Sequence, residues 1–212
     1  MSYFFSQIPL VVSYYTKGTP YEEEVRHLKA SCEQFKIEYH IEGILDRGSW
    51  EENCAVKPYF MKDKMRQFQG PLLWVDADAV FIQPMQFEEF MFTDLGLLKY
   101  QNEEDLRFSV NAATIYVNAT EGGCKALDLW CSYTDSIKHA KEKIPPYIDQ
   151  ASLYLVFLAN PPIAISLLPL RYCKIYDHNL EEGDSKGVVI EQRQASRRFK
   201  VEKTPVFHTI PE

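Results

Sequence analysis

The chain has 212 residues, of which 46% are hydrophobic, and it carries a formal net charge of −7 at pH 7. This size and composition suit a single domain, residues 1–212, with a substantial buried core. The negative charge argues against a nucleic-acid partner or a general affinity for anionic membranes. No stretch approaches the roughly 20 apolar residues of a membrane helix, and the first five residues lack the features of a signal peptide.

Five cysteines are scattered along the sequence, and none of them forms a Cys-x-x-Cys pair. Their odd number and their spacing argue for reduced thiols and against a disulfide framework or a zinc site. We therefore expect a cytoplasmic protein.

The first third of the sequence predicts a β-α-β unit. Thr19 suits the N-cap of a helix, Pro20 suits its first position, and the three glutamates that follow favour the positive helix end. Short β-branched and aromatic runs on both sides read as strands. The expected elements are a strand at 10–15, a helix from Thr19, a strand at 37–41, a polar loop at 46–53 and a helix that follows Lys57-Pro58.

The most informative segment is 70–84, which opens with a Gly-Pro turn signal and closes at a proline. Leu72 to Val75 are all apolar, as in a strand that is covered on both faces. Asp76 and Asp78 follow two residues apart, and an extended backbone would place both carboxylates on one side. Because two such charges repel each other, a bound hard cation would stabilise them. The alternative is a pair of solvated aspartates in a turn.

The remainder of the sequence alternates strand and helix patterns. Strands are expected at 80–82, 95–100, 108–117, 163–168, 172–176, 188–191 and 204–208, and helices at 122–143 and 150–158, the latter capped by Asp149. This alternation predicts an α/β fold with three layers, αβα, and a mostly parallel central sheet that has one or more antiparallel strands near its middle.

These features, in this order, resemble a nucleotide-sugar glycosyltransferase with the glycosyltransferase A fold, and the pattern is most similar to the retaining families 8 and 77. The specific parts of the resemblance are the segment 72–78 and the pair Asp149-Gln150. The resemblance implies that Asp76 contacts the ribose and a Mn²⁺ (or Mg²⁺) ion, that Asp78 binds the ion, and that His208 completes the metal site. The glycine and Lys-Pro that usually follow this histidine in family 8 are missing.

The same resemblance assigns further residues to the donor. It implies that Tyr14 and Thr16 contact the base, that Lys57 faces the phosphates or the sugar, and that Asn111 faces the sugar. Asp149 and Gln150 would lie at the reacting carbon as catalytic residues. For each residue a structural role is the alternative: a strand position for Tyr14, an exposed lysine, a backbone hydrogen bond for Asn111 and a helix cap for Asp149.

A cluster of basic residues near the C-terminus could receive diphosphate or an anionic acceptor; the alternative is a solvated face that pairs with glutamates. The cluster comprises Arg193, Arg197, Arg198 and Lys200.

The function that these features predict is metal-dependent transfer of a sugar, with retention, from a nucleotide diphosphate sugar such as a UDP-sugar to an acceptor hydroxyl. Two alternatives remain open. One is a haloacid dehalogenase-like phosphatase, which also places Asp-x-Asp after a buried strand. The other is a nucleotide-sugar-binding module without turnover.

Overall fold

The computed structural model describes residues 8–86, 93–99, 110–140, 144–175, 187–196 and 199. The elements are β1 (Leu10–Thr16), α1 (Tyr21–Gln34), β2 (Tyr39–Ile44), α2 (Trp50–Cys54), α3 (Lys57–Phe68), β3 (Leu72–Val75), β4 (Ala79–Phe81), β5 (Leu95–Lys99), β6 (Val110–Val117), α4 (Glu121–Ala140), α5 (Ile148–Leu158), β7 (Ile165–Leu167), η3 (Leu170–Tyr172), β8 (Lys174–Ile175) and β9 (Ile190–Gln192). Among the described residues, no helix is long and apolar enough to cross a membrane.

The central sheet has six strands in the order β2-β1-β3-β6-β5-β7. β1 pairs in parallel with both β2 and β3, and β5 pairs in parallel with β7. β6 is antiparallel to both of its neighbours, β3 and β5. The prediction of a mostly parallel sheet with an antiparallel strand near the middle is confirmed. The carboxyl ends of β1, β2 and β3 therefore lie at one edge of the sheet.

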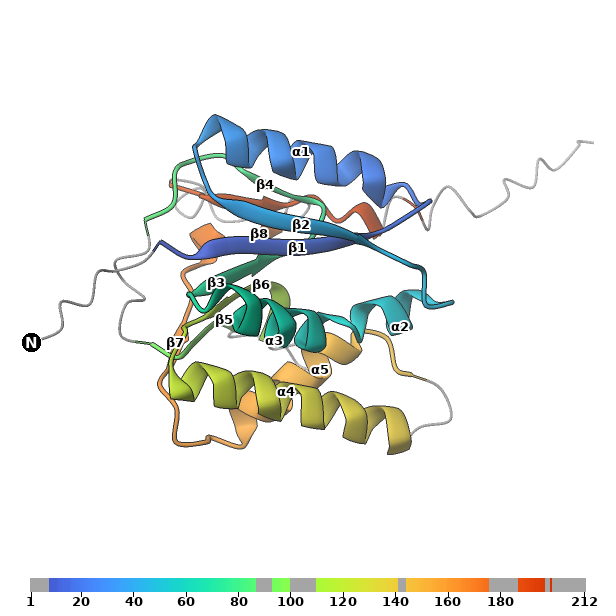
Figure 1. Cartoon of the computed structure of the whole chain (residues 1–212), viewed down its shortest axis with the longest axis vertical. Coiled ribbons are helices and arrows are strands. Elements are labelled where there is room, and N and C mark those ends of the chain that lie inside the picture. Colours follow the sequence, from blue (N-terminus) through green and yellow to red (C-terminus); the bar gives the residue numbers. More distant parts are fainter. Residues whose placement is uncertain are drawn as a thin grey trace, which may run out of the picture.

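The sheet lies between two outer layers, which confirms the αβα prediction (Figure 1). Helices α3, α4 and α5 cover one face. The other face is covered by α1 together with a second, three-stranded sheet in the order β4-β9-β8. One outer layer is thus part helix and part sheet, because the strand expected at 80–82 forms β4 and pairs with β9.

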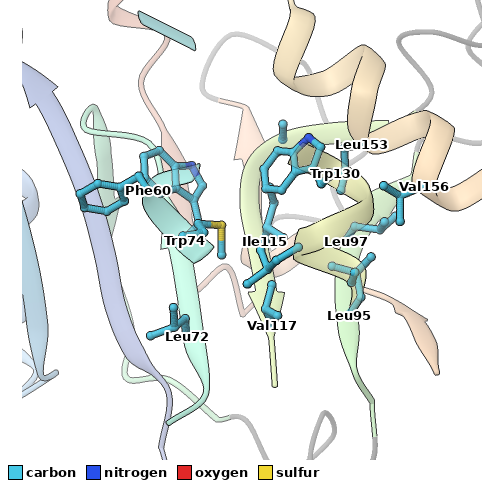
Figure 2. Close-up of a cluster of buried hydrophobic side chains, with 14 of the residues drawn as sticks. Phe60, Leu72, Trp74, Leu95, Leu97, Ile115, Val117, Trp130, Leu153 and Val156 are labelled. Atoms are coloured by element: carbon cyan, nitrogen blue, oxygen red, sulfur yellow. The ribbon is translucent and has the colours of Figure 1, made fainter. Parts of the chain in front are cut away.

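The all-apolar sequence of β3 follows from this layering. Leu72 and Trp74 pack into the core on the side of α3, α4 and α5, whereas Leu73 and Val75 pack into the core on the side of α1. Figure 2 shows Trp74 beside Phe60 on the first of these sides. Further along the same side, Trp130 of α4 and Leu153 and Val156 of α5 lie over β5 and β6 (Figure 2).

Three predictions of helix starts were wrong. Thr19 is not the N-cap of α1, because that helix begins at Tyr21 with Pro20 at the N-cap. The loop expected at 46–53 contains the start of α2, which begins after Ser49; the Ser49 Oγ accepts a hydrogen bond from the Glu52 N–H at 3.1 Å. Asp149 is not the cap of α5, because that helix begins at Ile148 with Tyr147 at the N-cap. All five cysteines are free thiols.

Candidate functional site

A pocket of about 770 Å³ opens at the carboxyl ends of β1 and β3. This volume is within the usual range for small-molecule sites. The predicted site residues of the described chain all line this pocket: Tyr14, Thr16, Lys57, Asp76, Asp78, Asn111, Asp149 and Gln150. His208 lies outside the described residues, as do Arg197, Arg198 and Lys200.

Lys57 is the centre of the polar network in the pocket. It is the first residue of α3, and its side chain is only 5% exposed. Its Nζ lies 2.5 Å from Asp149 Oδ2 and 3.0 Å from Asp76 Oδ1, and it donates a third hydrogen bond to the Ala112 carbonyl at 3.0 Å. A lysine ammonium has three N–H donors, so these three acceptors engage all of them. The alternative of an exposed lysine is excluded.

The charge of Lys57 is maintained by its partners. Burial lowers the pKa of the ammonium, but the negative charges of Asp149 and Asp76 outweigh burial, and the net effect raises the pKa. The Trp74 ring adds a cation–π contact, with Nζ 5.1 Å from the ring centroid. Lys57 is therefore a fixed positive charge that ties α3, the end of β3 and the start of α5 together.

Asp76 and Asp78 were expected on an extended backbone, and this prediction was wrong. The chain turns immediately after β3, and the Ala79 N–H donates to the Asp76 carbonyl at 2.9 Å. Asp76 Oδ1 accepts hydrogen bonds from Lys57 and, at 2.9 Å, from the Trp74 indole. Asp78 Oδ2 instead accepts from the Ala195 N–H at 2.6 Å, on the side of β9. Each carboxylate keeps one oxygen that no other described residue engages: Oδ2 of Asp76 and Oδ1 of Asp78.

The environment of Asp78 opposes its ionisation. Its pKa is raised to about 6, chiefly by burial and then by the nearby charge of Asp76. A divalent cation would offset both effects, since it supplies positive charge where two carboxylates compete. No group of three or more His, Cys, Asp or Glu side chains that could hold a metal occurs within the described ranges. A hard cation held by this pair would have to take its remaining ligands from phosphate oxygens, water or residues outside those ranges.

Asp149 and Gln150 lie in the first turn of α5, next to each other on the pocket wall. Helix α4 fixes the backbone of Asp149, because the Trp130 indole N–H donates to the Asp149 carbonyl at 2.9 Å and to Ser152 Oγ at 2.9 Å. With 6% of its surface exposed and Lys57 on Oδ2, Asp149 is a fixed carboxylate. The nearby Cys54 thiol has a pKa raised well above its usual value by burial and by Asp149, so it is not a thiolate.

The residues predicted to bind the donor differ in how they face the pocket. The Tyr14 ring packs against Phe60 and Trp74, with centroid distances of 5.3 and 5.0 Å, and its hydroxyl donates to the Asn53 carbonyl at 2.6 Å. Thr16 is 7% exposed at the end of β1. Asn111 Oδ1 accepts from the Ala113 N–H at 2.7 Å, as the structural alternative required. Contacts of these residues with a donor stay predictions.

The sequence analysis did not assign a role to most of the aromatic residues that line the pocket, among them Trp50, Trp74 and Tyr147. The sequence did contain a signal for Trp74. It precedes Asp76 by two residues, and residues two apart in a strand point to the same face of the sheet. Trp50 fell in the polar loop expected at 46–53, and Tyr147 fell between the helices expected at 122–143 and 150–158, so no periodicity marks either residue.

Neither a protein-family model nor the sequence of a curated protein matches this chain. Many solved structures share its fold. One of them is described as the crystal structure of a glycosyltransferase involved in the glycosylation of the major capsid of PBCV-1. The match has a TM-score of 0.63 at 10% sequence identity and covers 92% of this chain and 99% of that one. At this identity the likeness shows a common fold over nearly the whole chain, and it does not single out families 8 or 77.

Proposed function

We propose that the chain is a metal-dependent glycosyltransferase that moves a sugar from a UDP-sugar to an acceptor hydroxyl. The observation that carries this proposal is the pair Asp76 and Asp78, each with one carboxylate oxygen that no other described residue engages, in the same pocket as Lys57 and Asp149. The fold that the chain shares with a solved glycosyltransferase supports it.

The charge of the pocket supports a requirement for a cation. Its described lining contains four aspartates, namely Asp46, Asp76, Asp78 and Asp149, and one lysine, Lys57. A pyrophosphate would meet net repulsion there, and the ammonium of Lys57 is already engaged by three acceptors. A bound Mn²⁺ or Mg²⁺ supplies the missing positive charge and acts as a Lewis acid on the diphosphate.

The residues of the chain then have separate roles. Asp76 and Asp78 hold the cation at the end of β3. Lys57 fixes the orientation of Asp76 by the 3.0 Å contact and that of Asp149 by the 2.5 Å contact. It thereby sets the distance between the metal site and the start of α5, where Asp149 and Gln150 would face the anomeric carbon. Such fixed charges stabilise developing charge without reorganisation during the reaction.

The transfer conserves atoms and charge as follows. The bond from the anomeric carbon to the β-phosphate oxygen breaks, and its electron pair leaves with UDP. The acceptor oxygen forms the new bond to that carbon, which has oxocarbenium character in the transition state. The acceptor proton passes to the departing phosphate oxygen. Because the Asp149 carboxylate is held by Lys57 on Oδ2, we favour attack on the face that the phosphate leaves, with retention, over a covalent intermediate.

The test is a thermal-shift screen of UDP and UDP-sugars with and without Mn²⁺, followed by an assay of UDP release. We expect UDP plus Mn²⁺ to raise the melting temperature of the native chain and to leave Asp78→Asn unshifted. Asp63→Asn is a matched control, since Asp63 is an exposed acid of α3 outside the pocket. A native chain that binds UDP but never releases it from any UDP-sugar would be a binding module. Absence of any nucleotide shift would refute the proposal.

A further inference from the structure

Four aromatic side chains form a continuous arch along the pocket wall. The Trp50 and Tyr147 rings meet edge to face, with centroids 5.3 Å apart and an interplanar angle of 83°. Tyr21 and Phe199 form a second such pair, at 5.3 Å and 85°. Trp50 lies near the Tyr21 hydroxyl, and this proximity joins the two pairs. This aromatic arch (Tyr21, Trp50, Tyr147 and Phe199) lines the pocket from the start of α1, through α2, to the start of α5.

Tyr147 is the unusual member of the aromatic arch. Its backbone is in the left-handed region, with φ 58° and ψ 37°, which a residue with a side chain seldom adopts. Its side chain is large, yet 42% of the residue is exposed. Strained residues that persist in a fold cluster at binding and catalytic sites. Tyr147 precedes Asp149 by only two residues, and both line the same pocket.

The charges of the pocket restrict what else can bind there. The described lining contains four aspartates and one lysine, and that lysine has no donor left for a ligand. An anionic acceptor would add negative charge to a pocket that already has to hold the pyrophosphate with the help of a cation. A neutral molecule with hydroxyl groups could donate hydrogen bonds to the carboxylates and to Gln150. Its C–H faces could pack against the aromatic rings.

Sugars combine these two properties. Building on the proposed glycosyltransferase function, we propose that Trp50 and Tyr147 form the acceptor subsite and that the acceptor is a neutral saccharide. The Tyr147 ring stacks on a pyranose of the acceptor and presents one of its hydroxyls to the anomeric carbon near Asp149. This assigns an acceptor class and two specificity-determining residues to the pocket.

The test compares the native chain with Tyr147→Gly and Tyr147→Phe. Glycine adopts the left-handed backbone without strain, so the first variant removes the ring and keeps the fold. The second variant keeps the ring. Probes are lactose, maltose and mannobiose, with glucose 6-phosphate and a serine-containing peptide as anionic and peptide competitors. Saturation-transfer NMR measures saccharide binding, and UDP release measures transfer.

We expect neutral disaccharides to be the preferred acceptors. In Tyr147→Gly, we expect the dissociation constant for the preferred saccharide to rise by about tenfold, the size of a lost aromatic contact, while the affinity for UDP with Mn²⁺ stays within about twofold. Tyr147→Phe is expected to keep most of the saccharide affinity. A preference for the phosphorylated sugar or the peptide would overturn the proposal, as would an equal loss of UDP affinity, which would place the base on Tyr147.

This experiment separates the two proposals. If UDP with Mn²⁺ does not bind the native chain, the glycosyltransferase proposal fails, and the NMR measurement without nucleotide still decides whether Tyr147 binds saccharides. If UDP binds and is released but no neutral saccharide binds or accepts, only the acceptor proposal fails.

Discussion

Substitution of Lys57 by methionine probes the polar network of the pocket directly. The methionine side chain would fill a similar volume but leave Asp149, whose side chain is 8% exposed, as a buried carboxylate without its partner. Removing one member of a buried ion pair typically costs about 3–5 kcal/mol. Asp76 contributes less, because its side chain is 36% exposed and water can hydrate it. We therefore expect Lys57→Met to lower the free energy of unfolding by about 3–5 kcal/mol.

The assay is urea unfolding at pH 7.5 in EDTA, followed by tryptophan fluorescence. With a urea dependence of about 2–3 kcal/mol per molar, the midpoint should fall by roughly 1–2 M. Adding Asp149→Asn to Lys57→Met removes the unpaired charge and should recover about half of the loss. If Lys57→Met alone does not fold, the stability of the double variant can still be compared with that of the native chain.

The matched control is Lys138→Met, because Lys138 pairs with Glu52 at 2.9 Å but the two side chains are far more exposed, at 34% and 37%. Such a surface pair contributes less than about 1 kcal/mol. A loss below about 1 kcal/mol for Lys57→Met, or no recovery in the double variant, would show that the network around Lys57 does not carry the charge coupling described above.

Four further predictions concern Asp78 and helix α4. The folded-state pKa of Asp78 is raised to about 6, so the ionised carboxylate destabilises the fold at pH 7.5. This destabilisation disappears as the pH falls through 6 towards the pKa of the unfolded chain. In urea unfolding, Asp78→Asn should therefore stabilise the metal-free chain at pH 7.5 by up to about 3 kcal/mol and have little effect at pH 3.5. For the same reason, Mn²⁺ affinity of the native chain, measured by calorimetry with UDP present, should rise with pH through about 6, and a flat profile would contradict the assignment of Asp78 as a ligand. Gly123→Ala would place a Cβ 2.0 Å from the Asn118 carbonyl oxygen, so it should lower thermal stability by the equivalent of about 2 kcal/mol or more. Trp130→Phe removes the N–H that donates to the Asp149 carbonyl. It should lower the free energy of unfolding by about 1–3 kcal/mol and reduce UDP release. Unchanged stability and UDP release would show that this hydrogen bond does not position α5.

Local pattern was sufficient for the parts of the site that lie within single elements. The apolar run at 72–75 predicted a strand that is buried on both faces, and the structure places Leu73 and Trp74 on opposite sides of the sheet at 0% and 1% exposure. Pattern also placed Asp76 and Asp78 after that strand and Lys57 directly before a helix, of which the structure makes it the first residue. These inferences succeeded because the burial pattern of a single element can be recognised from residues that are neighbours in the sequence. The start of α2 was missed although Ser49 and Glu52 have the spacing of a capping box.

The sequence by itself determined the αβα class, the central strand and the residues that were candidates for the pocket. Only the tertiary structure decided how those residues pair. The packing of α3 and α5 on the sheet brings Lys57 to Asp149, and the turn after β3 brings the Asp78 carboxylate to the Ala195 N–H. The approach of α2 to the start of α5 also brings Trp50 to Tyr147. Contacts of this kind depend on the relative positions of elements far apart in the chain, and local periodicity contains no information about them.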